Sequence, residues 1–272
     1  MGDGAVIVAG SSGVLGTAVV DRLRADGWAC LGAARSASRT TDFVWDCCSD
    51  DAAPTLAAAV TASGITRVHG LVWAAGTIGP IGPTRAGSAQ AFLRLYLEHV
   101  VAFVSAVGSL SDLLDRDRAP SVVAFSGGGA TTPFPRYAAY AAAKAALVRT
   151  IETLAIEEPA WRVNAVAPGF VASKMHDATL SAGRSAAGSN FDRTVQGLEH
   201  PVPPERAAGL TSFLMSDAAV GISGRLISAQ WDRWEEEAWR KRLRGHPTLG
   251  RLRRVDDMSV SDLSLPPGEP SD

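Results

Sequence analysis

The chain has little cysteine: Cys30, Cys47 and Cys48 are the only three in 272 residues. An odd number that includes an adjacent pair is not the pattern of a disulfide framework. No spacing of cysteine and histidine resembles a zinc site, so no metal is expected. We therefore expect reduced thiols and a cytoplasmic protein.

The sequence also lacks a large charge of one sign and a long hydrophobic run. Its formal net charge is -2, which gives no reason to expect a nucleic acid as partner. No apolar run is expected to reach the roughly 20 residues that a membrane span needs. The N-terminal "GAVIVAG" is too short for a signal peptide and follows Asp3. We expect neither a nucleic acid nor a membrane as partner.

Lysine is scarce, because arginine supplies almost all of the positive charge. One of the three lysines, Lys144, lies in "YAAYAAAKAAL" (137–147), four residues after Tyr140. Positions i and i+4 of a helix share a face. A neighbouring ammonium group favours the phenolate, so it is expected to lower the tyrosine pKa from its usual value of about 10. The pair indicates a tuned acid–base group; an amphipathic helix with an incidental tyrosine and lysine is the alternative.

Short apolar runs alternate with segments of helical periodicity along most of the chain. Strands are predicted near 5–10, 28–35, 41–46, 67–76, 120–126, 161–169 and 225–231, and helices near 14–27, 51–63, 87–114, 137–158 and 203–217. This order predicts an α/β fold, a Rossmann-type doubly wound parallel sheet of about seven strands with helices on both faces.

The predicted domain covers residues 1–230. The charged segment 231–272 is expected to be a C-terminal extension, partly helical and then flexible. The Gly/Ser-rich stretch 172–200 is expected to be a flexible lid that forms the substrate wall.

Glycines spaced three apart follow the first predicted strand in "AGSSGVLG" (9–16). Glycine permits a tight turn and lets backbone N–H groups approach a pyrophosphate at a helix N-terminus. A tight turn without a ligand is the alternative, but the position after the first strand favours a dinucleotide site. The residues expected to contact the cofactor here are Gly10, Ser12, Gly13, Leu15 and Gly16.

The second predicted strand ends without the acidic residue that an NAD-selective site needs for the adenosine ribose. Ala34 is followed by Arg35 and Ser36, with Arg39 nearby. Cations suit a 2'-phosphate, so NADP(H) is expected more than NAD(H), with Arg35 and Ser36 in contact. The alternative is that Arg35 is a solvated surface arginine.

From about residue 4 to 230, the sequence resembles the short-chain dehydrogenases/reductases. "YAAAK" (140–144) resembles the family's Tyr-x-x-x-Lys, and the glycine motif is similar, although Val14 replaces its usual second glycine. "WDC" (45–47), "WAAG" (73–76) and "RVNAVAPGFVASKM" (162–175) follow in the family's order. The resemblance implies further cofactor contacts from Asp46, Cys47, Ala74, Ala75, Gly76, Pro168, Gly169, Val171 and Ser173, and from Tyr140 and Lys144.

Two departures from the family concern catalysis. The position thirteen residues before the tyrosine, where the family has its catalytic serine, is Gly127, and Ser126 precedes it. If the glycine-rich loop shifts, Ser126 is expected within hydrogen-bond reach of the Tyr140 hydroxyl; Thr131 or Thr132 are alternatives. His99 falls where the family has a catalytic asparagine, and could relay protons because histidine titrates near neutrality. A packed or surface histidine is the alternative.

The resemblance implies a carbonyl–alcohol oxidoreductase with Tyr140, Lys144, Ser126 and His99 as catalytic residues. The substrate would be a small molecule, specialised-metabolite or sugar-derived, and the protein a homodimer or homotetramer. Two other functions stay open. One is a redox-neutral epimerase or dehydratase of the same fold, and the other is a non-catalytic dinucleotide-binding protein.

Overall fold

The computed structural model describes residues 4–254 as a single parallel sheet flanked by helices. The strands lie in the order β3-β2-β1-β4-β5-β6-β7. Their bounds are β1 Ala5–Ala9, β2 Cys30–Ala34, β3 Phe43–Val44, β4 Val68–Trp73, β5 Ser121–Phe125, β6 Arg162–Ala167 and β7 Arg225–Ser228. The strand order reverses beside β1, between β1 and β4, and ligands bind at the carboxyl ends of strands at such a point. The predicted doubly wound fold is confirmed.

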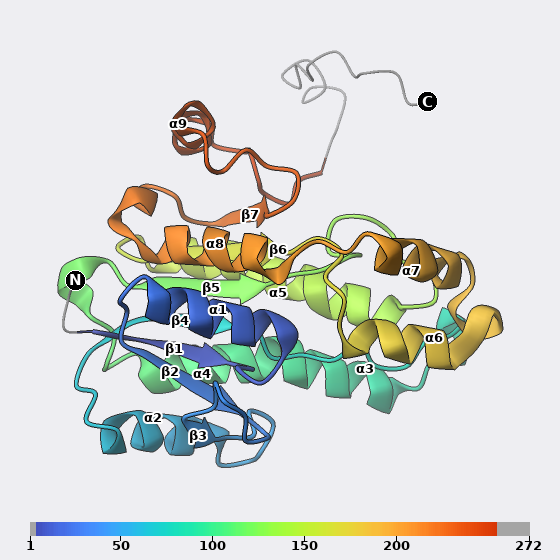
Figure 1. The fold of residues 1–272 in the computed structure, drawn as a ribbon, viewed down its shortest axis with the longest axis horizontal. Helices are drawn as coiled ribbons and strands as arrows, with labels where there is room; N and C mark the ends of the chain where they lie inside the picture. The colour runs from blue at the N-terminus through green and yellow to red at the C-terminus, as the bar shows by residue number, and fades with distance from the viewer. Residues whose placement is uncertain (1–3, 255–272) are drawn as a thin grey trace.

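Helices cover both faces of this sheet (Figure 1). Helices α1 (Val14–Ala25) and α8 (Pro204–Met215) pack on one face. Helices α2 (Ala52–Ala62), α4 (Ala102–Leu110) and α5 (Ala138–Glu157) pack on the other. Because both faces are covered, every residue of β1, β4 and β5 is buried.

The long predicted helix near 87–114 is three segments in a row. These are α3 (Ala89–Tyr96), a π-helical turn (Leu97–Val101) and α4. The expectation that no apolar run is long enough for a membrane span is wrong by length and composition. Ala89–Leu110 is a helical stretch of 22 residues, and an 18-residue window within it has a mean hydropathy of 1.4 and is 44% buried. The inner residues of this helix, Phe103 among them, belong to the core on one face of the sheet.

The Gly/Ser-rich segment 172–200 is mostly helical, and its role as a lid and substrate wall stays a prediction. It forms α6 (Lys174–Ala187) and α7 (Ser189–Glu199), which meet at Gly188. Its glycines lie where the helices break: Gly183 has a φ of 77° and Gly188 a φ of 60°. The two helices lie beyond the carboxyl ends of the strands (Figure 1).

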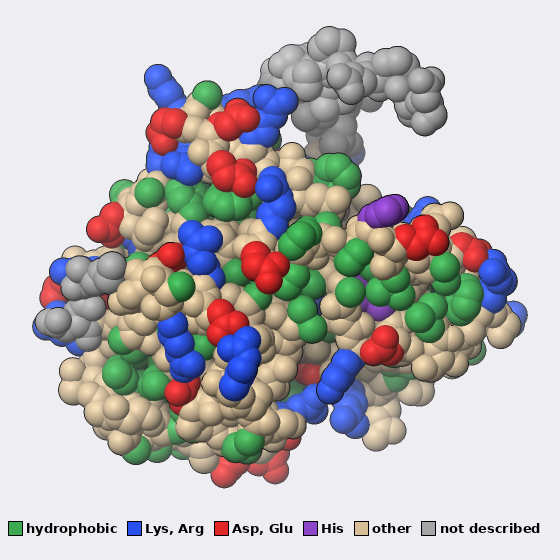
Figure 2. Space-filling view, in the orientation of Figure 1, with side chains coloured by type: hydrophobic (Ala, Val, Ile, Leu, Met, Phe, Trp, Pro, Cys, Tyr) green, Lys and Arg blue, Asp and Glu red, His purple; other side chains and the backbone are tan. Residues whose placement is uncertain are grey.

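The C-terminal residues 231–254 pack on the domain. Helix α9 (Glu237–Gly245) buries Leu243 in the same core as α1 and α8. Further along, Gly250 accepts a hydrogen bond from the Leu226 N–H of β7 at 2.7 Å, and Leu252 donates to Glu152 Oε1 at 2.6 Å. The predicted flexible end, 255–272, lies outside the described residues. On the face seen in Figure 2, acidic and basic side chains are interspersed.

Candidate active site and cofactor cavity

The turn between β1 and α1 is built from glycines with different tasks. Gly10 has a φ of 83°, and a Cβ there would lie 2.5 Å from the Ala75 backbone nitrogen. A Cβ on Gly16 would collide with the Gly10 carbonyl, so both glycines allow close packing. Gly13 is the N-cap residue of α1, and no side chain caps this helix end. A Cβ on Gly13 would have only the Gly10 carbonyl oxygen near it. The helix N-terminus is therefore available to an anionic group.

A cavity of about 630 Å³ lies beside this turn. Twelve predicted cofactor residues line it: Gly10, Ser12, Gly13, Leu15, Arg35, Ser36, Cys47, Ala74, Ala75, Gly76, Val171 and Ser173. Gly16, Asp46, Tyr140, Lys144, Pro168 and Gly169 are not among its lining residues. Thus the ends of β1, β2 and β4, far apart in sequence, enclose one space at the carboxyl edge of the sheet.

Several residues that line this cavity were not predicted from the sequence, notably Thr77, Glu98 and Lys174. Lys174 is another of the three lysines and begins α6, so the scarcity that singled out Lys144 could have indicated it. Thr77 and Glu98 come from different elements, and no sequence motif connects them.

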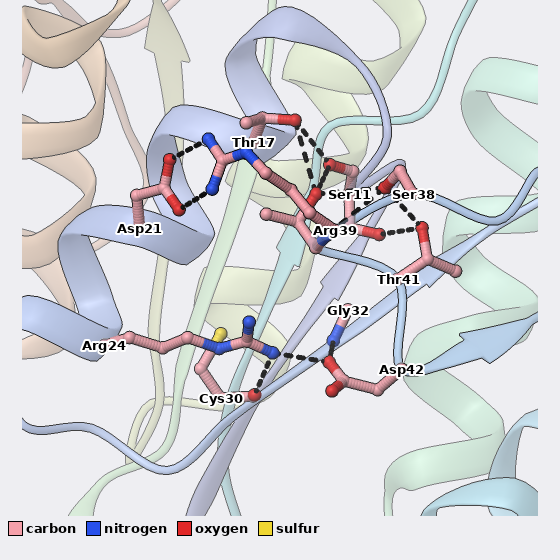
Figure 3. Close-up of polar contacts among 11 residues, drawn as sticks. Ser11, Thr17, Asp21, Arg24, Cys30, Gly32, Ser38, Arg39, Thr41 and Asp42 are labelled. Carbon is pink, nitrogen blue, oxygen red and sulfur yellow. Dashed lines mark hydrogen bonds and ion pairs between the residues drawn. The ribbon is translucent and has the colours of Figure 1, made fainter.

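At the end of β2, only one of the two expected arginines is available to a ligand. Arg39 donates twice to the Asp21 carboxylate, at 2.6 Å each (Figure 3). Arg35 lines the cavity and makes no hydrogen bond or ion pair with any residue of the described range 4–254. Of these two arginines, Arg35 is therefore the one that could meet a cofactor phosphate.

Tyr140 and Lys144 lie on the same side of α5 and are both buried. Lys144 Nζ donates to the Phe125 carbonyl at 2.7 Å and lies 5.8 Å from the centre of the Tyr140 ring. Burial lowers the pKa of Lys144 to about 8, against an opposing effect of the Glu98 charge.

The Tyr140 pKa is shifted in the direction opposite to the prediction. Burial raises the pKa of Tyr140 to about 12, because the phenolate loses its hydration. The Lys144 ammonium is hydrogen-bonded to a carbonyl rather than to the phenol, so it does not offset this loss. In this state Tyr140 is a protonated hydroxyl at neutral pH.

The position that faces the Tyr140 hydroxyl is Gly127. A Cβ built on Gly127 would overlap that hydroxyl. Ser126 Oγ is buried and has no hydrogen-bond partner within the described chain, so the expected direct bond to Tyr140 is wrong. The loop does not shift, because the Ser126 N–H still donates to the Val166 carbonyl of β6 at 2.8 Å. The alternatives Thr131 and Thr132 are exposed.

His99 lies in the π-helical turn with its ring against Gly76 and 5.6 Å, centre to centre, from the Tyr140 ring. Nε2 lies 2.8 Å from the Thr77 carbonyl, which can only accept, so the proton is on Nε2. Burial and the Lys144 charge lower the His99 pKa to about 3. Titration near neutrality, as the sequence suggested, is therefore wrong. The other ring nitrogen, Nδ1, is buried, unpartnered and an acceptor.

Asp46, Cys47 and Cys48 bring a carboxylate and two thiols within 4.8 Å of one another. A thiol binds metal as the thiolate. Burial raises the pKa of both thiols above its usual value. The three side chains therefore bring possible metal ligands together, but the two thiols stay protonated and so bind a metal ion poorly.

Comparison with known proteins agrees with this geometry. A family model described as enoyl-(acyl carrier protein) reductase matches residues 15–230. The chain belongs to the short-chain dehydrogenase/reductase family. A relative, 2-(S)-hydroxypropyl-CoM dehydrogenase 3 of Xanthobacter autotrophicus, is 30% identical over 181 residues, 62% of this chain and 68% of that protein. An inactive 2-(S)-hydroxypropyl-CoM dehydrogenase 2 of the same organism is also 30% identical, over 65% of this chain and 77% of its own length.

Solved structures of this family share the fold. A short-chain dehydrogenase/reductase from Saccharomyces cerevisiae is 25% identical with a TM-score of 0.75, covering 87% of this chain and 98% of its own. The ligand-free aldohexose dehydrogenase of Thermoplasma acidophilum has a TM-score of 0.71 at 20% identity, over 83% of this chain and 92% of its own. The latter likeness concerns the fold alone.

Short-chain dehydrogenases/reductases are oxidoreductases of small-molecule carbonyls and alcohols that use nicotinamide dinucleotides, often as oligomers. The cavity residues fit such a cofactor. The uncapped start of α1 and the open side of Gly13 suit a pyrophosphate. Arg35, in the lining, is without a partner among residues 4–254. Outside the lining, the buried Ser126 Oγ and His99 Nδ1 have their hydrogen-bonding capacity unused.

Proposed function

We propose that this protein is an NADP(H)-preferring oxidoreductase that interconverts a carbonyl and an alcohol on a small molecule. The observation that carries the proposal is the buried Tyr140–Lys144 pair on one face of α5, with Nζ 5.8 Å from the tyrosine ring. A protein that only binds a dinucleotide has no need for a phenol beside an ammonium. The preference for NADP(H) is supported by Arg35. Its side chain lines the cavity at the end of β2 and has no ion-pair partner among residues 4–254.

In the proposed reaction, the bound nicotinamide supplies or accepts the hydride. Tyr140 holds a proton on its hydroxyl and donates it to the substrate oxygen in the direction of reduction. With a pKa of about 8, Lys144 is mostly protonated at neutral pH and keeps N–H donors beyond the one given to Phe125. Those donors suit ribose hydroxyls, and the same charge favours the phenolate once Tyr140 has given up its proton.

His99 and Ser126 contribute as hydrogen-bonding groups rather than as titrating ones. His99 Nδ1 accepts and Ser126 Oγ can donate, so each has an unfilled capacity for a water or a substrate atom. Since Gly127 leaves no side chain opposite Tyr140, the carbonyl is polarised mainly by the tyrosine hydroxyl. We expect a slower proton transfer than a site with a serine at that position would give.

The substrate surroundings are proposed to be apolar. Tyr140 belongs to a cluster with Leu95, Tyr137 and Ala187, and Ile78, Ile81, Phe92, Phe134 and Phe191 pack against it. Tyr137 donates to Thr179 Oγ1 at 3.0 Å, which ties α6 to the start of α5 beside this cluster. An apolar carbonyl compound fits these side chains better than a sugar does.

A second copy of the chain is the proposed protein partner. Leu93, Leu97, Val101 and Val104 follow one side of the α3–α4 helix and are each more than 40% exposed. Such an apolar stripe is typical of an interface. Light scattering during size-exclusion chromatography would report a dimer or tetramer, and a monomer at micromolar concentration would contradict this assembly.

The function is tested with Tyr140→Phe. Wild type is first screened for NADPH oxidation with a panel of apolar ketones and sugar-derived carbonyls. Tyr140→Phe should bind NADP+ with unchanged affinity and lose about 10²- to 10⁴-fold in turnover. Tyr137→Phe is the matched control, because its hydroxyl bonds Thr179 instead of facing Gly127, and turnover should stay within a few fold.

The two other functions give different results in the same assay. A redox-neutral epimerase or dehydratase would convert its substrate without net oxidation of NADPH. A non-catalytic binding protein would bind NADP+ and turn over none of the panel, and the glycine at 127 is the feature that favours it. Equal turnover of Tyr140→Phe and wild type would rule out the proposed mechanism.

A further inference from the structure

Glu98 is a buried carboxylate that the proposed reaction does not use. It lies in the π-helical turn next to His99, and 7% of its surface is exposed. Thr77 Oγ1 donates to its Oε2 at 2.7 Å. No other hydrogen bond and no ion pair reaches this carboxylate from residues 4–254. A buried carboxylate normally needs two or more donors to offset its lost hydration, so Glu98 has acceptor capacity left.

Glu98 lies near the part of the cavity where the adenosine half of a dinucleotide would bind. It lines the cofactor cavity and also a neighbouring cavity of about 680 Å³. Arg35 and Cys48, from the ends of β2 and β3, line both cavities as well. In this fold the residues after the second strand face the adenosine ribose, and the glycine turn separates that half from the nicotinamide. Glu98 therefore borders the space for the adenosine.

Asp46, for which the family resemblance implies a cofactor contact, lies in a different environment from Glu98. It is exposed, and its Oδ1 accepts from the Cys48 backbone N–H at 3.0 Å, which caps its own turn. It lines the neighbouring cavity and is not among the residues that line the cofactor cavity. Of the two acids, Glu98 is the one that is buried, lines the cofactor cavity and can accept further hydrogen bonds.

A carboxylate repels phosphates, so its partner on the cofactor must be a neutral donor. Two such donors on the adenosine half are the adenine amino group and the ribose 2'-hydroxyl of NAD+. We propose that Glu98, held by Thr77, accepts a hydrogen bond from such a neutral donor of the adenosine and is the acid that recognises this half. The inference rests on the proposed use of a nicotinamide dinucleotide.

The test measures affinity by calorimetry for three probes: NADP+, NADP+ with hypoxanthine in place of adenine, and NAD+. Hypoxanthine lacks the amino group, and NAD+ carries a 2'-hydroxyl in place of the phosphate. Glu98→Met removes the acceptor at similar size, and Glu98→Gln weakens it. Asp46→Asn is the matched control for the other acid. Far-UV circular dichroism checks that each variant is folded, and Glu98→Gln serves if Glu98→Met is not.

If the adenine amino group is the donor, wild type should bind the hypoxanthine analogue about tenfold or more weakly than NADP+. Glu98→Met should reduce that difference to about twofold or less, and Asp46→Asn should preserve it. If the ribose 2'-hydroxyl, which NAD+ carries and NADP+ lacks, is the donor, Glu98→Met should instead lower affinity for NAD+ relative to NADP+ by a similar factor.

The inference is overturned if neither affinity ratio changes in the Glu98 variants, or if Asp46→Asn alone removes the discrimination. Because ratios are compared, any effect of the Glu98 charge on Lys144 cancels. Failure of wild type to bind any of the three probes would be a different result, since it would overturn the proposed function together with this inference.

Discussion

The Tyr140 hydroxyl lies in the space that a side chain at position 127 would fill, and glycine at that position is what allows it. The strand that leads to Gly127 keeps its backbone pairing through Ser126, so the chain cannot bring the serine side chain around to the tyrosine. Tyr140 and Gly127 are thus matched in shape. A change at one position has to be accommodated at the other.

Gly127→Ala should destabilise the protein by about 1–3 kcal/mol, the usual cost of overpacking a filled site. The added methyl group would press on the hydroxyl of a fully buried tyrosine. Gly128→Ala is the matched control, because a Cβ there would meet only Phe134 carbons, at 3.9 Å. Urea denaturation of both variants measures the free energy of unfolding. Similar values for the two would show that Tyr140 gives way easily.

Arg35→Asp should shift the cofactor preference toward NAD(H). A carboxylate at this position repels the 2'-phosphate and accepts hydrogen bonds from ribose hydroxyls. The ratio of NADP+ to NAD+ affinity should fall by about tenfold or more, as expected for a lost hydrogen bond to a charged group. Arg39→Ala should leave the ratio unchanged, since Arg39 is held by Asp21. A preference that moves only with Arg39 would contradict the assignment.

His99 should make the protein sensitive to acid. Its pKa in the folded state is about 3, below the usual value of 6.5. The unfolded chain therefore binds more protons, and the stability contribution is present above pH 6.5 and is lost as the pH falls toward 3. Between pH 7 and pH 4.5 this amounts to about 2–3 kcal/mol.

Urea unfolding of wild type and His99→Asn at both pH values measures this contribution. The stability of His99→Asn should fall less on acidification than that of wild type. His200→Asn, at an exposed position, should behave as wild type does. If His99→Asn and wild type lost equal stability, His99 would not be buried in its neutral form.

The sheet and the Tyr140–Lys144 pair are predictable because their signals are local. Apolar runs that alternate with segments of helical periodicity predict where the strands and helices lie along the chain. A spacing of four residues in a helix brings a tyrosine and a lysine to one face. Residues 172–200 were harder to predict, because Gly183 and Gly188 suggested a loop. In the fold these glycines interrupt helices whose remaining residues are compatible with helix.

The rest of the site depends on packing between elements. Whether Ser126 or Gly127 faces Tyr140 depends on how far the pairing of β5 with β6 continues. The charge state of His99 depends on burial beneath Gly76, and the Glu98–Thr77 contact joins a helix to the end of β4. Sequence spacing carries no information on such contacts. It also does not show how deeply Tyr140 is buried, and burial is what raises its pKa.

The hydrogen bond from the Leu226 N–H to the Gly250 carbonyl occupies part of the β7 edge of the sheet. β7 is the last strand of the sheet, and a strand in that place ordinarily offers its free N–H and C=O groups to another chain. Here the C-terminal segment of the same chain takes up that position, and Arg225 holds it further through the Leu249 carbonyl at 2.6 Å. The Leu226 N–H is therefore not free to pair with a strand of a second copy beside β7. The C-terminal segment thus protects this edge of the sheet from edge-to-edge aggregation.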